Sequence, residues 1–190
     1  MRPEEGPLKV SQTDADLVHQ ALGGDQQACA ELMARHRPRL ERYAYFLLGN
    51  REEAEEALQD TFVRAFRGLD QCLDRSRIGT WMFQILVNRC RSRMRRLDLI
   101  DRGARAEVAY VTAKAPTTWV AGEWREEIER ALGELTSDQR EAFLLRFVED
   151  FSYDEMEALT GAPASALRMR VLRARQHLRR RLEEALRDHA

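Results

Sequence analysis

Apolar residues recur every three to four positions over most of the chain, which is the period of an α-helix. Capping residues and glycines mark where the predicted helices begin and end. In chain order we expect helices over residues 14–22, from 25, over 38–49, 50–69, 80–97 and 124–132, from 136, from 152, and over 164–186. Pro38 is expected to open a separate helical segment. No stretch alternates polar and apolar residues as a strand does, so the predicted fold class is all-α.

The helical periodicity stops between two groups of predicted helices. Residues 98–122 contain Gly103, Pro116 and Gly122 and have no sustained period, which is typical of a flexible linker. We therefore expect two small helical domains. The division is an N-terminal tail over residues 1–13, a first domain over 14–97, the linker over 98–122 and a second domain over 123–190.

The last two predicted helices have the plan of a helix-turn-helix. Residues 152–155 (SYDE) form a capping box, Gly161 and Pro163 make a turn, and an arginine-rich helix follows. Helical spacing puts four apolar residues of this last helix on its buried face: Leu167, Val171, Ala174 and Leu178. The outward positions would face DNA. A solvated basic face and a membrane-surface helix are the alternatives.

The distribution of charge indicates a nucleic-acid partner, although the net charge of −1 does not. Residues 51–60 hold five acids against one arginine, residues 89–96 hold five arginines and no acid, and residues 164–187 hold eight arginines against two acids. Such segregated blocks indicate different partners on different faces. Of the basic residues 29 are arginine, whose planar guanidinium binds phosphates and base edges bidentately.

The segment TWMFQILVNRCRSRMRR, residues 80–96, changes character at Asn88. Its first half is apolar, and Trp81 and Ile85 can share a buried face because they are four residues apart. Its second half carries the five arginines, which would face nucleic acid, with aromatic and polar neighbours able to hold unpaired bases. The alternative is a core helix with a solvated basic tail. The acidic face of residues 51–60, taken alone, is typical of a solvated surface.

Patterns of catalytic and metal-binding residues are missing from the sequence. No motif surrounds the four histidines, no glycine-rich phosphate loop is present, and Cys29, Cys72 and Cys90 have neither zinc nor disulfide spacing. We therefore expect no catalysis, no metal and no cofactor. No apolar run reaches the roughly 20 residues that span a bilayer. Residues 1–10 lack the apolar core of a signal peptide, which predicts a cytoplasmic protein.

Several segments in order resemble the extracytoplasmic function sigma factors of bacterial RNA polymerase. They are GDQQACAELMARHRPRL (24–40), EEAEEALQDTFVRAFRGL (52–69), the segment 80–96 and the stretch from LTSDQREAFLLRF to LRRRL (135–182). The resemblance covers about residues 14–97 and 123–186. It implies an alternative sigma factor that binds core polymerase and directs promoter-specific initiation in response to environmental or envelope stress. The linker would run towards the RNA exit channel.

The resemblance implies three sets of site residues. Those that would bind the clamp helices of the largest polymerase subunit are Glu55, Glu56, Leu58, Gln59, Asp60 and Phe62. Those that would open and read the minus-ten element are Cys72, Ile78, Trp81, Asn88, Arg89, Arg91, Arg95 and Arg96. Those that would read the minus-thirty-five element are Arg168, Met169, Arg170, Leu172, Arg173 and Arg175. The resemblance also implies contact with the flap of the second-largest subunit and an anti-sigma factor as negative regulator.

The sequence departs from the family at two sites. Cys72 and Ile78 occupy positions near which the family usually has phenylalanines, which bears on the pocket for the flipped base. The last helix begins Ser165-Ala166-Leu167 where the family often has Gly-Thr-Val, which implies a changed minus-thirty-five preference. Cys72, expected in an exposed loop, also allows a redox hypothesis.

Two other classes of function are compatible with parts of the pattern. A conventional helix-turn-helix regulator would bind duplex DNA as a dimer, without being a polymerase subunit. A nucleic-acid-processing enzyme would need a carboxylate or histidine cluster that the sequence does not assemble. Binding to core polymerase distinguishes a sigma factor from both.

Overall fold

The computed structural model describes residues 12–103 and 124–188, and every regular element in these two ranges is helical. The prediction of an all-α fold is therefore confirmed for the described residues. The helices are α1 (Asp14–Leu22), α2 (Gln26–Leu48), α3 (Arg51–Arg67), α4 (Ile78–Gly103), α5 (Arg125–Gly133), α6 (Ser137–Phe147), α7 (Tyr153–Thr160) and α8 (Ala164–Asp188), with short 3₁₀ turns η1 (Leu69–Gln71) and η2 (Arg75–Arg77) before α4.

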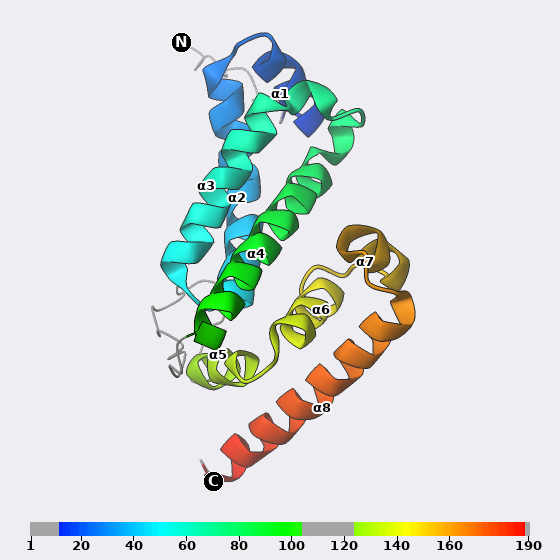
Figure 1. Cartoon of the computed structure of the whole chain (residues 1–190). Helices are drawn as coiled ribbons and strands as arrows, with labels where there is room; N and C mark the ends of the chain where they lie inside the picture. Colours follow the sequence, from blue (N-terminus) through cyan, green and yellow to red (C-terminus); the bar gives the residue numbers. More distant parts are fainter. Residues whose placement is uncertain (1–11, 104–123, 189–190) are drawn as a thin grey trace, which may run out of the picture.

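Helices α1 to α4 form the N-terminal unit. Figure 1 shows α2, α3 and α4 running alongside one another, with α1 across one end. Tyr43, Leu58 and Phe83 are fully buried where the three long helices meet, and the rings of Tyr43 and Phe83 pack edge to face with centroids 4.7 Å apart. Each such side chain contributes about 1.5–3 kcal/mol through removal from water. This core fixes the orientation of α4 and therefore of its basic half.

Local sequence signals set the helix ends as predicted. Asp25 accepts from the backbone N–H groups of Gln27 and Ala28 at the start of α2. In a capping box, the side chain of the N-cap residue accepts from the backbone N–H three residues later, and the side chain of that later residue accepts from the N-cap N–H. Such boxes open α6 at Thr136 and α7 at Ser152. The α7 box lowers the pKa of its carboxyl, Glu155, because the Ser152 backbone and hydroxyl donate to the ionised form.

Two predicted helix boundaries are wrong. Pro38 does not open a new segment but lies inside α2. The cost of an internal proline is about 3 kcal/mol. It is outweighed here because Leu32 and Leu40 on either side are buried in the same core. Helix α4 continues to Gly103 rather than ending near Leu97, since no glycine or proline interrupts the chain before Gly103. The rest of the predicted linker, residues 104–122, lies outside the described residues.

Helices α5 to α8 form the C-terminal unit. The predicted inward stripe of α8 is confirmed, because Leu167, Val171, Ala174 and Leu178 are all buried. Gly161 ends α7 with a left-handed backbone (φ 71°), which glycine adopts without steric cost. Phe147 of α6 is half exposed, although it lies at helical spacing from buried Leu144. It lies at the rim of an apolar groove between α5, α6 and α8.

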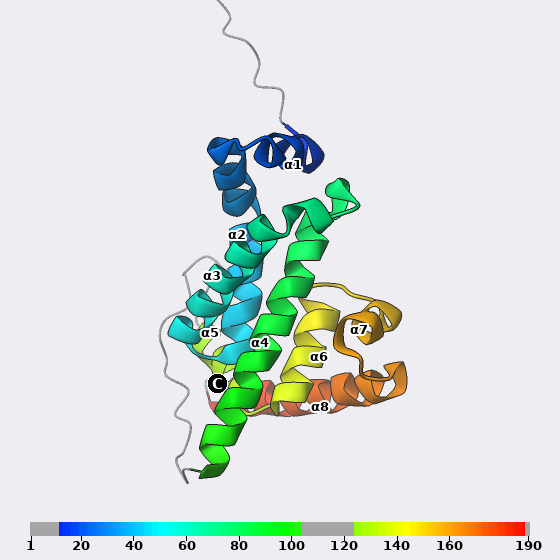
Figure 2. The same ribbon diagram turned by 45° about the horizontal axis from the view of Figure 1, so that its top comes forward.

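The two units pack against each other. Figures 1 and 2 both place α6 beside α4, and the chain path brings the C-terminal end of α2 to the start of α6. Phe83 of α4 and Phe151, which precedes α7, have ring centroids 5.4 Å apart. The buried guanidinium of Arg140 on α6 donates to the carbonyl of Leu47 on α2 at 2.9 Å. The units therefore share a polar and aromatic interface.

Candidate nucleic-acid and polymerase interface

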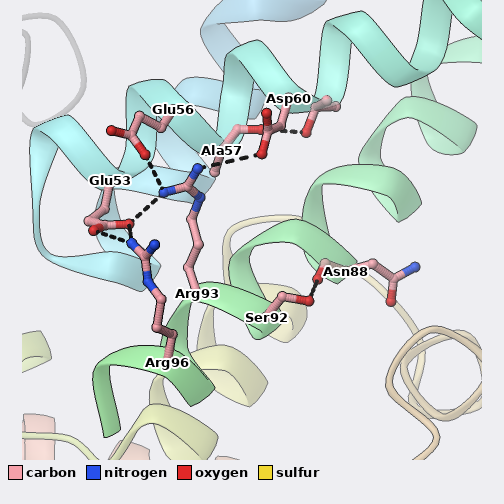
Figure 3. Close-up of polar contacts among 9 residues, drawn as sticks. Glu53, Glu56, Ala57, Asp60, Asn88, Ser92, Arg93 and Arg96 are labelled. Carbon is pink, nitrogen blue, oxygen red and sulfur yellow. Dashed lines mark hydrogen bonds and ion pairs between the residues drawn. The ribbon is translucent and has the colours of Figure 1, made fainter. Parts of the chain in front are cut away.

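The acidic block of α3 and the basic half of α4 lie against each other (Figure 3). One guanidinium nitrogen of Arg93 donates to Glu53 at 2.6 Å and to Glu56 at 2.7 Å, and another approaches Asp60 at 3.5 Å. Arg96 donates to Glu53 at 2.8 Å. Two of the five arginines in residues 89–96 are thus paired with carboxylates within the N-terminal unit.

The predicted polymerase-binding residues of α3 divide between its two faces. Leu58 and Phe62 are buried in the core. Glu55 accepts from Arg37 of α2 in an ion pair at 2.7 Å. The side chains of Glu56 and Asp60 are 61% and 55% exposed although both contact Arg93. Together with exposed Gln59, these carboxylates leave an accessible acidic surface on α3.

A polar pocket of about 650 Å³ lies between the C-terminal half of α3 and the first half of α4. It brings together three residues of the predicted minus-ten set, Trp81, Asn88 and Arg89. Asn88 is exposed and, in Figure 3, points away from the acidic cluster around Arg93. The Nε atom of Arg89 is buried and has no hydrogen-bond partner within the described residues. This donor is available to an acceptor that enters the pocket.

Arg64 and Arg67 of α3 line the same pocket and were missed by the sequence reasoning. Both are exposed, and neither side chain has an ion pair or hydrogen bond within residues 12–103 and 124–188. The pocket lining therefore carries three arginines against a single acid, Asp60. A sequence signal existed: the acids of α3 occupy its first turns and arginines its last, so the charge of this helix reverses along its length.

Other residues of the predicted minus-ten set lie elsewhere. Arg91 faces the C-terminal unit, where it donates to the carbonyl of Thr160 at 2.6 Å and pairs with Glu141 at 3.2 Å. Arg95 is exposed and makes one long contact, 3.5 Å, with Ser92. The arginines of α4 thus point in three directions: towards α3, towards the C-terminal unit and towards the pocket or solvent.

The expectation that Cys72 lies exposed is wrong. Cys72 is 5% exposed and Ile78 is fully buried, so neither side chain offers DNA a surface in this conformation. Both are apolar enough to join the core beneath the loop, which is why they are drawn inward. Burial, followed by the charge of Asp74, raises the pKa of the Cys72 thiol. A protonated, covered thiol is a poor redox sensor.

Leu73, next to Cys72, is the residue of this loop that faces outward. Its side chain is 96% exposed, and it lines a small pocket of about 290 Å³ with Gln71, Trp81 and Gln84. An exposed apolar side chain beside an aromatic residue can support an unstacked base. Sequence reasoning missed Leu73 because it expected Cys72 to be the exposed residue of this loop.

The outward face of the helix-turn-helix is as predicted. Arg168, Met169, Leu172 and Arg173 are all exposed. Arg173 has no ion pair or hydrogen bond to any described residue, and Arg168 lies over the ring of Tyr153 with its guanidinium carbon 5.0 Å from the centroid. Arg170 instead pairs with Asp138 at 2.6 Å. The guanidinium carbon of Arg175 lies 5.9 Å from the centroid of the Phe147 ring. Arg170 and Arg175 are thus more constrained than Arg173.

An apolar groove of about 730 Å³ runs between α5, α6 and α8, with Phe46 of α2 at one end. Among its lining residues are Ile128, Phe143, Phe147 and Leu172. Within the described parts of the chain, no group of three or more His, Cys, Asp or Glu could hold a metal ion, and none of the described helices is both long and apolar enough to cross a bilayer.

Comparison with known families matches the two units separately. Residues 32–99 match the model of sigma-70 region 2, and residues 125–178 match that of sigma-70 region 4. The ECF RNA polymerase sigma factor EcfG of Rhodopseudomonas palustris is 35% identical, over 74% of this chain and 77% of the relative. The chain belongs to the extracytoplasmic function sigma factors. It is an alternative sigma factor, a polymerase subunit that directs transcription initiation.

Other relatives and solved structures agree with this assignment. The RNA polymerase sigma factor CarQ of Myxococcus xanthus is 32% identical over 85% of this sigma factor and 92% of its own length. The sigma factor RpoE of Bartonella quintana, solved with the anti-sigma factor NepR, superimposes with a TM-score of 0.68 at 28% identity, covering 81% of this chain and 96% of the other. CnrH, solved with the cytosolic domain of CnrY, has a TM-score of 0.60 at 27% identity, over 91% and 99%.

Proposed function

We propose that the pocket between α3 and α4 holds the unpaired strand of the minus-ten element. The observation that carries this proposal is the convergence of unpaired donors on one hollow surface: Arg64, Arg67 and Arg89 beside Trp81 and Asn88. Phosphates pair with the arginines, an unstacked base contacts the indole, and the Asn88 amide offers a donor and an acceptor to a base edge. Leu73 supports the flipped base at the neighbouring small pocket.

In this proposal the chain makes and breaks no covalent bond, so the free energy that opens the duplex comes from binding. Unstacking and unpairing a base costs a few kcal/mol. Charge-assisted contacts to phosphate and stacking on the aromatic ring, about 1–3 kcal/mol per base, offset that cost. Arg93 and Arg96 serve another purpose: their pairs with Glu53 and Glu56 hold the end of α4 on α3.

The remaining roles follow the division into two units, with the first domain over residues 14–97, the linker over 98–122 and the second over 123–190. The acidic surface of α3 at Glu56, Gln59 and Asp60 binds the clamp helices of the largest polymerase subunit. The outward face of α8 at Arg168 to Arg173 reads the minus-thirty-five element. The protein acts in the cytoplasm, where polymerase and promoter are.

An anti-sigma factor is the proposed negative regulator. One solved relative is a complex with an anti-sigma factor, NepR, and CnrH is a complex with the cytosolic domain of CnrY. The apolar groove between α5, α6 and α8 has the size and lining to receive an apolar helix face. The flap of the second-largest polymerase subunit is the competing occupant of this surface.

The test is promoter-specific initiation with purified components. The protein is mixed with bacterial core polymerase and a library of promoter fragments, and start sites are mapped. Specific start sites that depend on the protein are expected. Replacing Asn88 by alanine should abolish open-complex formation while polymerase binding persists, whereas Arg51→Ala, at the far exposed end of α3, should change neither. Tight duplex binding without polymerase would instead support a conventional helix-turn-helix regulator.

A further inference from the structure

Two arginines on the outward face of α8 have different surroundings. Arg168 and Arg173 are both exposed, and neither has an ion pair or hydrogen bond to any described residue. Of the two, Arg168 lies against an aromatic ring: its guanidinium carbon is 5.0 Å from the ring centroid of Tyr153, the first residue of α7. An arginine that rests on a ring has fewer conformations to lose on binding than one that moves freely.

The Tyr153 ring is itself held in place by the fold. It is partly buried and packs against the hydrophobic core. A second neighbour is Arg146 of α6, whose guanidinium carbon lies 5.8 Å from the same ring centroid. Arg146 is tethered in turn, because it donates to the carboxylate of Asp150 and to the carbonyl of Phe151, both at 3.2 Å. Arg168 therefore rests on a ring whose position is fixed before any DNA arrives.

Another contact between the same two helices fixes the backbone that carries Arg168. The carboxylate of Glu157 on α7 accepts from the backbone N–H of Ala164, the first residue of α8, at 2.9 Å. Tyr153 and Glu157 are one turn apart on α7, and Ala164 and Arg168 are one turn apart on α8. The two contacts therefore align successive turns of the helices. Together they set the start of α8 and the direction of the Arg168 side chain.

We propose that Tyr153 is a positioning residue for promoter recognition, which orients Arg168 towards one base pair of the minus-thirty-five element. The proposal rests on the proposed reading of that element by the outward face of α8. A cation–π contact uses the face of the ring and leaves the N–H groups of the guanidinium without acceptors. These donors stay available to O6 and N7 of a guanine, the commonest arginine target in the major groove. Arg173 has no such support.

Nuclear magnetic resonance of the isotope-labelled full chain, without polymerase or DNA, tests the contact itself. The ring current of Tyr153 should shift the side-chain proton resonances of Arg168 upfield of those of Arg173. Tyr153→Leu should remove this shift, because it removes the ring, whereas Tyr153→Phe should keep it. The remaining resonances report whether each variant is folded. If the resonances of Arg168 already coincide with those of Arg173 in the wild type, the proposal is overturned.

Selection from a library of minus-thirty-five sequences, with the chain bound to core polymerase, tests the role in recognition. Arg168→Ala and Arg173→Ala identify the base pairs that each arginine reads. Tyr153→Leu should reduce the preference at the Arg168 base pair by about two- to fivefold, the size of an exposed cation–π contact, and leave the Arg173 base pairs unchanged. Tyr153→Phe should keep the full preference. Leu159→Ala, which removes partly buried apolar surface from α7, is the matched control and should change no base preference.

Three outcomes of the selection would overturn the positioning role. Equal losses in Tyr153→Leu and Tyr153→Phe would show that the hydroxyl acts rather than the ring. A loss over all base pairs, or one equalled by Leu159→Ala, would show that Tyr153 only stabilises the fold. A further loss when Tyr153→Leu is added to Arg168→Ala would show that Tyr153 does not act through Arg168.

Failure of the proposed function would have a different signature. Arg168→Ala and Arg173→Ala would then both leave every base preference unchanged, although the resonances of Arg168 keep their upfield shift. In that case α8 does not read the minus-thirty-five element, and the positioning role falls with the reading while the contact between Tyr153 and Arg168 stands.

Discussion

Helices α4 and α8 both carry many arginines, yet these side chains have different surroundings. In α4, Arg93 and Arg96 bind the carboxylates of α3, and Arg91 binds groups of the C-terminal unit. In the first turns of α8, Arg173 faces outward without an ion pair to any described residue, and Arg168 lies over an aromatic ring. The same residue type therefore supports the fold in one helix and leaves its charge available in the other.

The difference arises from what each helix packs against. The acidic first turns of α3 lie beside the end of α4, so the two charge blocks cancel. The available charge of the N-terminal unit comes instead from the other end of α3, where Arg64 and Arg67 face the pocket with Arg89. A count of arginines along the sequence thus overestimates the unpaired positive charge of α4 and misses that of α3.

The largest effect should follow loss of an available arginine of α8. Arg173→Ala should reduce initiation at a cognate promoter by about 5- to 150-fold, the equivalent of 1–3 kcal/mol for one base contact. Thermal stability should not change, because the exposed side chain has no ion pair or hydrogen bond to any described residue. Arg179→Ala, which removes an exposed arginine further along α8, is the matched control. Equal losses from both variants would mean that α8 contributes charge but no base readout.

Loss of a paired arginine of α4 should act on stability instead. Arg93→Ala leaves Glu56 and Asp60 without their cation and Glu53 with Arg96 alone, and we expect it to lower the free energy of unfolding by about 2 kcal/mol. Urea unfolding followed by circular dichroism measures this. Arg95→Ala on the same turn, with one long contact to Ser92, should cost less than about 0.5 kcal/mol. If the two variants are equally stable, the acid–arginine cluster contributes nothing to the fold.

The pocket arginines should show a purely electrostatic signature. Arg64→Ala with Arg67→Ala should weaken binding of polymerase holoenzyme to a fork-junction promoter by about tenfold, irrespective of sequence. The slope of log affinity against log salt should fall by about 1.4, since each phosphate contact on a single strand contributes about 0.7. Arg51→Ala, on the same helix outside the pocket, should leave the slope unchanged. A sequence-dependent loss would argue for base contacts by these residues.

Glu141 should make the packed state more stable in weak acid. Burial raises the pKa of Glu141 to about 6, and the nearby charge of Arg91 opposes this shift. Asp138 raises the pKa further, whereas Arg170 and Arg95 lower it. The buried Tyr43 of α2 also interacts electrostatically with Glu141. Because the buried pKa is above the ordinary value of 4.5, stability from this group is present at low pH and is lost as pH rises through 6. Wild type should gain about 1 kcal/mol between pH 7 and pH 5 relative to Glu141→Gln. Identical pH profiles of unfolding for the two proteins would show that Glu141 is not buried in solution.

The smallest effect should come from Cys72. Cys72→Ala should change the rate of initiation by less than a factor of two, which corresponds to a free-energy change of roughly 0.5 kcal/mol. In the folded protein, iodoacetamide should modify half-buried Cys29 before the buried Cys72 and Cys90. Rapid alkylation of Cys72 with loss of promoter binding would restore the redox hypothesis.

Much of the fold was predictable because it depends on local signals. The caps at Asp25, Thr136 and Ser152 set the starts of three helices, and the apolar stripe of α8 set its buried face. Both signals act between residues that are close together in the sequence. Pro38 defeated the same reasoning, since burial on both sides of it outweighed its local cost. The family's motifs also identified the segments that match sigma-70 regions 2 and 4, which no periodicity could do.

The site was predictable only in part. Asn88, Trp81 and Arg89 do share a pocket, but Cys72 and Ile78 entered the core because apolar side chains in a loop are drawn inward when the loop folds over a bundle. Leu73, one residue from Cys72, took the exposed position. A shift of a single residue in an irregular loop reverses which side chain is outside, and no helical period fixes it.

By itself, the sequence determined an all-helical chain with a helix-turn-helix, an acidic block and two basic blocks, because spacing and caps act over a few residues. Only the tertiary structure decided which charges meet. Glu53 and Arg93 are 40 residues apart, and Glu149 and Arg39 are 110 apart. Coulomb energy depends on distance in space and on burial, so the packing of the helices decided which arginines are paired within the fold and which remain exposed.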